Sequence, residues 1–445
     1  MNRRRTYAHH QCWLHYPRSC DILQALALTL GLGTCAHANS QQASSFSGQG
    51  EVYALGQAQI LNANAAFNPS NVFLHLPRSS AAVDSRFELR AASDPIDFKL
   101  RLRGIARSSD CLCIDSEYAS LYPTQAYARL KLGSNTKVNF GRQLLTWGPA
   151  TFRSPSNPFY FDAGRTRPLS ELSGIDAVGV TYGQGNWVLN MAQVFSSGHV
   201  SGPDGESFSG SQVGSNDFKG TSLVRLEMQR EKFDMGLVAA KKQDAAGFIG
   251  GYASLDIDDA WKVWVEAGLG RRPWAVTSVA SHTSYLVTEP SGMATTALAG
   301  ASYTFLDGQS VQVEYLFDGH GLSSRDKLDY FDTAALASAN LSGALAGQSA
   351  ATLSKGLRYA PASLSKHYLA VVWQSSPQKS EYVRVMWAIN IVDGSHQPSL
   401  YAEYPFSDRA SWILNAALNF GAARSEFGTS PVGNSLTVGF KFNLF

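Results

Sequence analysis

The lengths of the connections between strand-like segments constrain the fold more than any other feature of this sequence. Segments with the period-two alternation of β-strands recur along the chain, and the connections between them are alternately tight and long. The tight connections are residues 93–95, 133–135, 183–186, 230–232, 258–259, 306–309, 376–379 and 407–409. The long connections are residues 63–81, 107–121, 146–173, 197–217, 271–294, 318–364 and 421–434, with short exceptions at residues 243–247 and 393–398.

This alternation of short and long connections, the loop parity, predicts an antiparallel sheet with turns at one end and loops at the other. A soluble β-sandwich has no reason to sort its connections by length, whereas bacterial outer-membrane barrels have short periplasmic turns and long extracellular loops. We therefore predict an all-β fold, a transmembrane antiparallel up-and-down β-barrel of about 18 strands. The expected strands are residues 50–62, 82–92, 96–107, 122–132, 136–145, 175–182, 187–196, 219–229, 233–242, 248–257, 261–270, 295–305, 310–317, 367–374, 381–391, 400–405, 411–420 and 435–445.

The hairpin of residues 82–107 shows the alternation most clearly. Its charged face carries both signs, and its other face is apolar, with Phe98, Leu100 and Leu102 on the second arm. In a soluble sheet the apolar face would point to a core. In a membrane barrel the apolar face points to lipid and the charged face to a watery lumen, and the loop parity favours this second interpretation.

The N-terminus reads as an export signal. Residues 1–38 combine a basic start, a short apolar run at residues 22–32 and the small-residue site Ala36-His37-Ala38. We predict a cleaved signal peptide at residues 1–38 and a single barrel domain at residues 39–445. A lipoprotein signal ending at Cys35 is disfavoured, because Thr34 is a poor residue before a lipidated cysteine.

Cleavage would remove four arginines and one aspartate from the 37 basic and 35 acidic residues, which leaves 33 and 34. A near-neutral chain gives no reason to expect a nucleic-acid partner. Cys111 and Cys113 would be the remaining cysteines, and a local disulfide or a loop-tip position suits them better than a metal site, because no second Cys or His pair has ligand spacing. No metal or other cofactor is expected.

The sequence also gives little sign of catalysis. It has no zinc-protease motif, no nucleophile elbow around a serine and no glycine-rich phosphate loop. No apolar stretch after the signal is long enough for a transmembrane helix, which needs about 20 residues. A barrel of 18 strands encloses an aqueous lumen rather than a packed interior. We therefore expect a protein that is not an enzyme.

Two groups of side chains are candidate functional residues. The first is a basic wall on four neighbouring strands, where planar guanidinium groups in sequence could pass an anion along. The alternative is that these charges simply pair across strands, as in any wet lumen. The predicted pore-lining residues are Arg86, Arg90, Lys99, Arg101, Arg103, Arg129, Lys131 and Lys137.

The second group lies in the third long loop, residues 146–173. Prolines and aromatic residues give this loop the means to hold a shape, unlike a Gly/Ser-rich surface loop. We predict a constriction loop folded into the lumen, and the alternative is a rigid outer cap. Its candidate residues are Trp147, Arg153, Asp162, Arg165, Arg167 and Glu171. The Ala-rich stretch 333–357 of the seventh loop is expected to form a short helix.

The chain ends within its last expected strand, at Asn443-Leu444-Phe445, which resembles the terminal signature of bacterial outer-membrane proteins. Simple alternation places Phe445 on the opposite face from Phe440, Phe442 and Leu444, and a frayed end would reconcile the two. Together with the parity, the basic wall and the third loop, the chain resembles the 18-stranded carboxylate-specific porins of Gram-negative bacteria and the alginate exporters.

That resemblance implies a multi-pass channel in the outer membrane of a Gram-negative bacterium. Its partners would be membrane lipid, lipopolysaccharide, and small anionic solutes or acidic saccharides that diffuse passively. Alternatives are polysaccharide export or capsule assembly, a general porin without preference and, least favoured, a barrel enzyme. Monomer and homotrimer both remain open, because lipid-facing and trimer surfaces are equally apolar.

Overall fold

The computed structural model describes residues 45–110, 117–162, 164–196, 218–243, 247–271 and 274–445. These residues belong to one compact unit, Ser44–Phe445. The expected signal peptide and the Cys111 and Cys113 pair lie outside the described residues.

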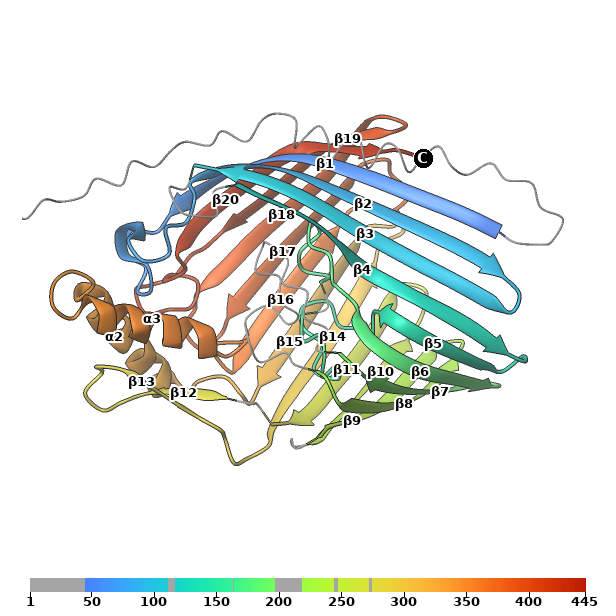
Figure 1. Ribbon diagram of the computed structural model, residues 1–445, viewed down its shortest axis with the longest axis horizontal. Helices are drawn as coiled ribbons and strands as arrows, with labels where there is room; N and C mark the ends of the chain where they lie inside the picture. Colours follow the sequence, from blue (N-terminus) through green and yellow to red (C-terminus); the bar gives the residue numbers. More distant parts are fainter. Residues whose placement is uncertain (1–44, 111–116, 163, 197–217, 244–246, 272–273) are drawn as a thin grey trace, which may run out of the picture. The chain divides into compact units, whose positions relative to one another are not determined.

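The described chain forms a closed antiparallel barrel of 18 strands, which confirms the predicted fold (Figure 1). Each strand pairs with the next along the chain, and β1 also pairs with β20, so the sheet has no free edge. The barrel strands are β1 (Ser45–Leu61), β2 (Ser79–Ser93), β3 (Ile96–Ser109), β4 (Glu117–Leu132), β5 (Thr136–Gln143), β6 (Ile175–Gln184), β7 (Trp187–Val194), β8 (Thr221–Arg230), β9 (Phe233–Lys242), β10 (Gly247–Asp256), β11 (Trp261–Gly270), β14 (Ala294–Thr304), β15 (Ser310–Asp318), β16 (His367–Gln374), β17 (Tyr382–Asn390), β18 (His396–Ser407), β19 (Ala410–Leu418) and β20 (Val432–Asn443).

The outer face of the barrel is apolar, as the alternation predicts. On β11, Trp261, Val265 and Leu269 are exposed, whereas Trp264 and Glu266 between them are buried on the inner side. A surface of this kind costs free energy in water and gains it in lipid. Closure of the sheet pairs the backbone groups that lipid would leave unsatisfied.

The hairpin of β2 and β3 has the predicted orientation. Arg86 lies opposite Arg103 and Glu88 opposite Arg101 on the inner face, while Phe98 is 56% exposed on the outer face. The terminal Phe445 lies beyond the end of β20. Its ring packs over Gly48 and Gly50, on the outer side, so the last residue leaves the strand alternation as a frayed end does.

Three loops pack together at the loop end of the barrel. The sixth loop forms a hairpin of β12 (Ala275–Ser278) and β13 (Tyr285–Thr288), and the seventh forms α2 (Ser324–Ala339) and α3 (Ala346–Tyr359). The sequence predicts only one short helix here, and the structure corrects this to two. Phe67 of the first loop, which contains a 3-10 turn at Pro69–Asn71, packs with Tyr285 and Tyr330. No helix among the described residues is long and apolar enough to cross a membrane.

Candidate functional site

The third loop connects β5 to β6 and reaches strands about halfway around the ring. The backbone N–H of Ala150 donates to Glu266 of β11 at 2.9 Å, and those of Thr151 and Phe152 donate to Glu314 of β15 at 2.7 and 2.6 Å. β11 and β15 lie across the barrel from β5 in the ring order. Because both glutamates are on the inner face, the loop runs inside the barrel.

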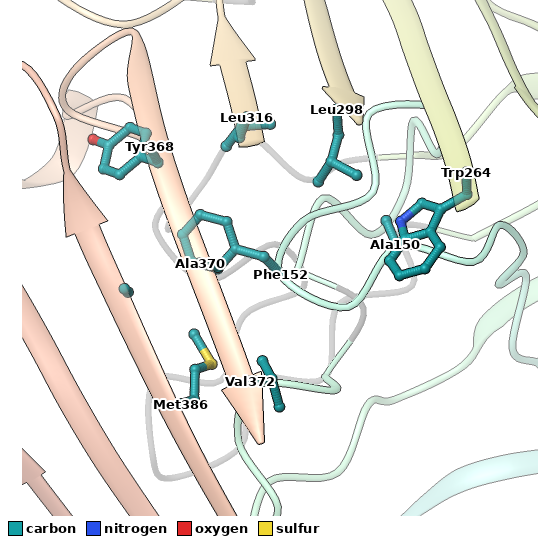
Figure 2. Packing of buried hydrophobic residues seen from close by; sticks show 10 residues of the cluster. Ala150, Phe152, Trp264, Leu298, Leu316, Tyr368, Ala370, Val372 and Met386 are labelled. Carbon is teal, nitrogen blue, oxygen red and sulfur yellow. The ribbon is translucent and has the colours of Figure 1, made fainter. Parts of the chain in front are cut away.

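Apolar packing reinforces these hydrogen bonds. Ala150 and Phe152 lie against the inner side of β11 and β14–β17, beside Trp264, Leu316 and Tyr368 (Figure 2). The Phe152 and Tyr368 rings are 6.1 Å apart between centroids. Each buried aromatic or aliphatic side chain here contributes about 1.5–3 kcal/mol, so the loop is held to the wall by packing as well as by polar contacts.

Glu266 and Glu314 are the residues that sequence reasoning missed. They are 2% and 1% exposed, and among the described residues no cation lies within ion-pair distance of either carboxylate. Their oxygens are satisfied by donors instead. Ser154 and Ser156 hydroxyls donate to Glu266 at 2.9 and 2.8 Å, and the Trp264 indole donates to Glu314 at 3.1 Å. A buried carboxylate needs such compensation, since desolvation without it costs several kcal/mol.

Two glycines make room for this contact. Gly148 has φ +79°, and a Cβ there would lie 2.3 Å from Oε1 of Glu266. On β11, a Cβ at Gly268 would lie 2.1 Å from the carbonyl oxygen of Pro155. The loop and the wall therefore approach each other so closely that a side chain at Gly148 or Gly268 would clash, and only glycine fits at these two positions.

The base of the loop is fixed by the segments flanking it. Arg142 of β5 forms a two-pronged ion pair with Asp176 of β6, at 2.8 and 2.9 Å. The side-chain Oδ1 of Asn157 accepts from the backbone N–H groups of Phe159 and Tyr160, and its side-chain Nδ2 donates to the Leu145 carbonyl oxygen. Trp147, a predicted constriction residue, is buried and donates from its indole to the Ser156 carbonyl.

The returning half of the loop contains the predicted residue Asp162. Arg153 and Arg167 pair with it at 3.2 and 3.5 Å, and Gly164 donates its N–H at 2.9 Å. Burial alone would raise the pKa of this carboxyl, but the two guanidinium groups and the hydrogen bonds outweigh burial and lower it. Arg165 is exposed and donates to the Ala150 and Gly148 carbonyls, which ties the two halves of the loop together.

The loop then meets the basic wall. Arg101 of β3 pairs with Glu171 at 2.6 Å, and Thr124 of β4 donates to the same carboxylate at 2.6 Å. Thr124 is the extra residue of a bulge in the β3–β4 register, and a bulge turns a side chain toward a site in this way. Arg86 donates to the Leu169 carbonyl and lies 3.6 Å from Glu171.

Some of the predicted pore-lining residues are buried in ion pairs within the wall, whereas others keep part of their side chains exposed. Arg86 and Arg103 are buried and both pair with Asp84, so they build the wall rather than present free charge. Glu88 binds Arg90, Lys99 and Arg101 together. The Arg90 side chain remains 60% exposed.

On the neighbouring strands, Lys131 pairs with Asp97 at 3.1 Å and keeps 37% of its side chain exposed. Lys137 is exposed directly opposite it, and Arg129 donates to Asn139 at 3.0 Å. The ion pairs described for the eight predicted cations involve four carboxylates, Asp84, Glu88, Asp97 and Glu171. Counted over the described residues, the basic wall therefore carries an excess of positive charge.

The loop divides the interior into cavities of different charge. A cavity of about 350 Å³ lies between the loop and β16–β19, and carboxylates and cations both line it, among them Asp162, Glu426, Arg167 and Arg384. A second cavity of about 230 Å³ lies against β4–β8, and its lining contains Arg129 and Arg225 but no Asp or Glu. No cluster of His, Cys, Asp and Glu suited to a metal ion is present among the described residues.

No family model and no curated protein sequence matches this chain. Solved structures do. OccAB1 of Acinetobacter baumannii is 10% identical with a TM-score of 0.52, over 90% of this chain and 97% of that one. OccK11 (OpdR) of Pseudomonas aeruginosa is 11% identical over 90% and 96%, with a TM-score of 0.49. A triple mutant of the Rhodopseudomonas blastica porin is 10% identical over 90% and 100%, with a TM-score of 0.41. The chain shares the barrel fold of OccAB1.

Proposed function

We propose that this protein is an outer-membrane channel through which small anionic solutes or acidic saccharides diffuse passively. The closed barrel with an apolar outer face and a charged inner face supports the membrane location. Lipid and lipopolysaccharide would surround it, in the outer membrane of a Gram-negative cell. The protein would act without catalysis, as a selective opening.

The anion preference is supported by a difference in exposure: carboxylates on one side of the lumen are buried, whereas cations on the other side are partly exposed. On β11 and β15 the loop covers Glu266 and Glu314 almost completely. On β2–β5 the cations outnumber their carboxylate partners, and Arg90, Arg101 and Lys131 keep part of their side chains exposed. A solute between the two sides therefore meets positive charge, which raises the local concentration of anions.

Ion selectivity in planar bilayers tests this proposal. The purified wild-type protein should conduct and should favour Cl⁻ over K⁺ in a salt gradient. The triple variant Arg90→Gln, Arg101→Gln, Lys131→Gln should lose most of this preference, because each substitution removes one exposed cation and leaves the buried Arg86 and Arg103 pairs in place.

Lys232→Gln is the matched control, since Lys232 is exposed in the turn between β8 and β9 and should leave selectivity unchanged. Cation selectivity in the wild type, or an unchanged ratio in the triple variant, contradicts the anion preference. Absence of any conductance contradicts the channel itself.

A further inference from the structure

We infer that the loop end of the barrel carries a pH-sensitive lid, which opens more readily at neutral than at mildly acidic pH. The lid is the packed body formed by the β12–β13 hairpin, α2, α3 and Phe67 of the first loop (Figure 1). Such a lid adds regulation to the proposed channel, and the contacts that fasten it involve neither the basic wall nor the anion preference.

The lid has a core and hydrogen bonds of its own. The Tyr285 hydroxyl of β13 donates to the Tyr330 carbonyl of α2 at 2.6 Å, and the Ser278 hydroxyl of β12 donates to the Asp329 carbonyl at 2.8 Å. From α3, the Lys355 ammonium donates to the Tyr285 carbonyl at 3.2 Å. Because these contacts lie within the lid, it can move as one body when its contacts to the barrel rim break. The side chains buried in its core are Phe67, Val276, Tyr285, Tyr330, Phe331, Ala334, Ala337, Leu353 and Leu364.

A buried lysine fastens the lid to the rim. Lys327 lies on the same face of α2 as Tyr330 and Phe331 and is 3% exposed. Its ammonium donates to Asp393 of the eighth loop at 2.7 Å and to Ser365 at 3.0 Å. A buried ammonium group is strongly unfavourable without such partners, so loss of the Asp393 contact would release α2.

A second ion pair between lid and rim is more exposed. Asp332 of α2 pairs with Arg424 of the ninth loop at 2.8 Å, but the Arg424 side chain is 58% exposed. Water screens such a pair, and exposed pairs contribute little to stability. Lys327 is therefore the stronger of the two connections.

Two carboxylates of the rim share this lysine. Asp393 lies between β17 and β18, and Glu426 lies between β19 and β20. The Asn390 Nδ2 lies 3.2 Å from Asp393 Oδ2 and 2.7 Å from Glu426 Oε2, so the two carboxylates are close neighbours. The Tyr368 hydroxyl also donates to Glu426. Among the described residues, Lys327 is the one cation within ion-pair distance of this pair, so the site holds more negative than positive charge when both carboxylates are ionised.

A proton on Glu426 removes this excess of negative charge. Part of Glu426 faces a cavity, but burial raises the pKa of its carboxyl and Asp393 raises it further, beyond what the hydrogen bond from Tyr368 offsets. Burial would also raise the pKa of Asp393, but hydrogen bonds from Lys327 and Ser395 outweigh burial and lower it. Protonation in mildly acidic solution therefore occurs on Glu426 and leaves the contact between Lys327 and Asp393 intact.

Linkage gives the direction of the pH dependence. Opening returns Glu426 to water, where a glutamate has a pKa of about 4.3, so the closed lid binds the proton more tightly than the open lid. The stabilisation is complete below about pH 4.3 and is lost as the pH rises through the closed-state pKa of Glu426. Protonation of Asp393, which would release Lys327, occurs only at lower pH. The lid is therefore held most firmly in mildly acidic solution.

Opening of the lid would change access to the lumen. Ala362 and Ser363 beside the lid, together with Glu426 and Phe427 of the rim, line the cavity of about 350 Å³ next to the third loop. Separation of lid and rim would therefore open this cavity toward the loop end. The other charged or titratable side chains around Glu426 include Tyr330 of α2, Tyr368 of β16 with Asp318 near it and, across the cavity, Arg153, Asp162, Arg167, Arg384 and Tyr401.

Amide hydrogen exchange of α2 tests the lid, with the folded full chain in detergent micelles between about pH 5 and about pH 8 and with rates corrected for intrinsic exchange. In the wild type, the protection of α2 should fall several-fold as the pH rises. Glu426→Gln, which is neutral at every pH and keeps the shape of the protonated acid, should hold the protection at its acidic level throughout. Lys327→Met should lower the protection at every pH, because it leaves both carboxylates without a cation.

Glu289→Gln is the matched control, because Glu289 is exposed in the sixth loop and should leave the pH dependence unchanged. Histidines ordinarily change charge near neutral pH, so a triple variant with His282, His320 and His396 replaced by Gln should also keep it. The lid is overturned by wild-type protection that does not change with pH, by unchanged protection in Lys327→Met, or by a pH dependence that persists in Glu426→Gln or vanishes in the histidine variant. These measurements need no conduction, so failure of the channel proposal in bilayers remains a separate result.

Discussion

At the scale of single residues, the third loop depends on a few positions where only one side chain fits. Gly148 and Glu266 show this most directly, because the carboxylate occupies the space that a Cβ would take. The sequence shows Gly148 directly after Trp147, and the alternation of β11 places Glu266 on the inward face. Their contact joins positions 118 apart in the numbering, so no local pattern could have revealed it.

Gly148→Ala should release the loop from β11. The left-handed backbone costs about 1–2 kcal/mol for a residue with a Cβ, and the methyl group would in addition displace Glu266. Gly133→Ala is the matched control, because Gly133 has φ +75° and no atom within 4 Å of the added Cβ. Thermal unfolding in micelles should show the larger loss for Gly148→Ala, and equal losses would contradict the contact.

Asp162 should make the loop sensitive to acid. Its pKa is lower in the folded protein than in an unfolded chain, so it stabilises the loop above its usual pKa of about 4 and loses this effect as the pH falls through the folded value. Asp162→Asn should therefore weaken the loop by about 1–3 kcal/mol near pH 7, and the difference from the wild type should shrink as the pH falls through the folded pKa of Asp162.

Amide hydrogen exchange across residues 150–170, corrected for intrinsic rates, measures this difference. Asp408→Asn is a suitable control, since Asp408 is exposed in the last turn. A difference between wild type and Asp162→Asn that stays constant with pH would show that the ion pairs do not hold the loop.

At the scale of elements, strands and turns could be predicted from sequence, whereas the contacts between loops and wall could not. Alternation sets which face of β3 is apolar, so the outward position of Phe98 follows from its neighbours in the sequence alone. The basic wall illustrates the limit. The alternation places both Arg103 and Arg129 on the inner face. In the structure, however, Arg103 is buried against Asp84 and Arg129 lines a cavity. Only the register and the path of the third loop separate them.

Glu314→Gln should loosen the loop at a single anchor. The new amide keeps the shape of the side chain but turns one acceptor into a donor that faces other donors, including the Thr151 and Phe152 N–H groups. We expect about 1–3 kcal/mol less protection of these two amides in hydrogen exchange. Glu231→Gln in an exposed turn should change nothing, and unchanged protection in Glu314→Gln would argue against the anchor.

At the scale of the whole molecule, the lumen combines the cationic side of β2–β5 with the side of β11 and β15, where the third loop covers Glu266 and Glu314. The sequence predicts the first from the density of Arg and Lys on β2–β5. The covering of Glu266 and Glu314 is visible only in the structure, where the third loop leaves β5 and contacts β11 and β15. The anion preference that we propose would be a property of this arrangement, since the chain as a whole has 37 basic and 35 acidic residues.

The anion preference should fall as salt rises. Exposed charges are screened over about 10 Å at 0.1 M ionic strength and about 3 Å at 1 M, so the Cl⁻ to K⁺ permeability ratio should decline between these concentrations. The triple variant at Arg90, Arg101 and Lys131 should show a flatter decline. A ratio independent of salt in the wild type would indicate selection by size rather than by charge.

The hydrogen bonds from the third loop to Glu266 and Glu314 also bear on the order of assembly. They join residues 116 and 162 positions apart in the chain, so the loop has no anchors until the later strands are in place. Closing such long chain segments is slow compared with forming neighbouring hairpins. The third loop therefore stays unanchored until β11 and β15 have joined the sheet, and the narrowing of the lumen depends on the pairing of those later strands.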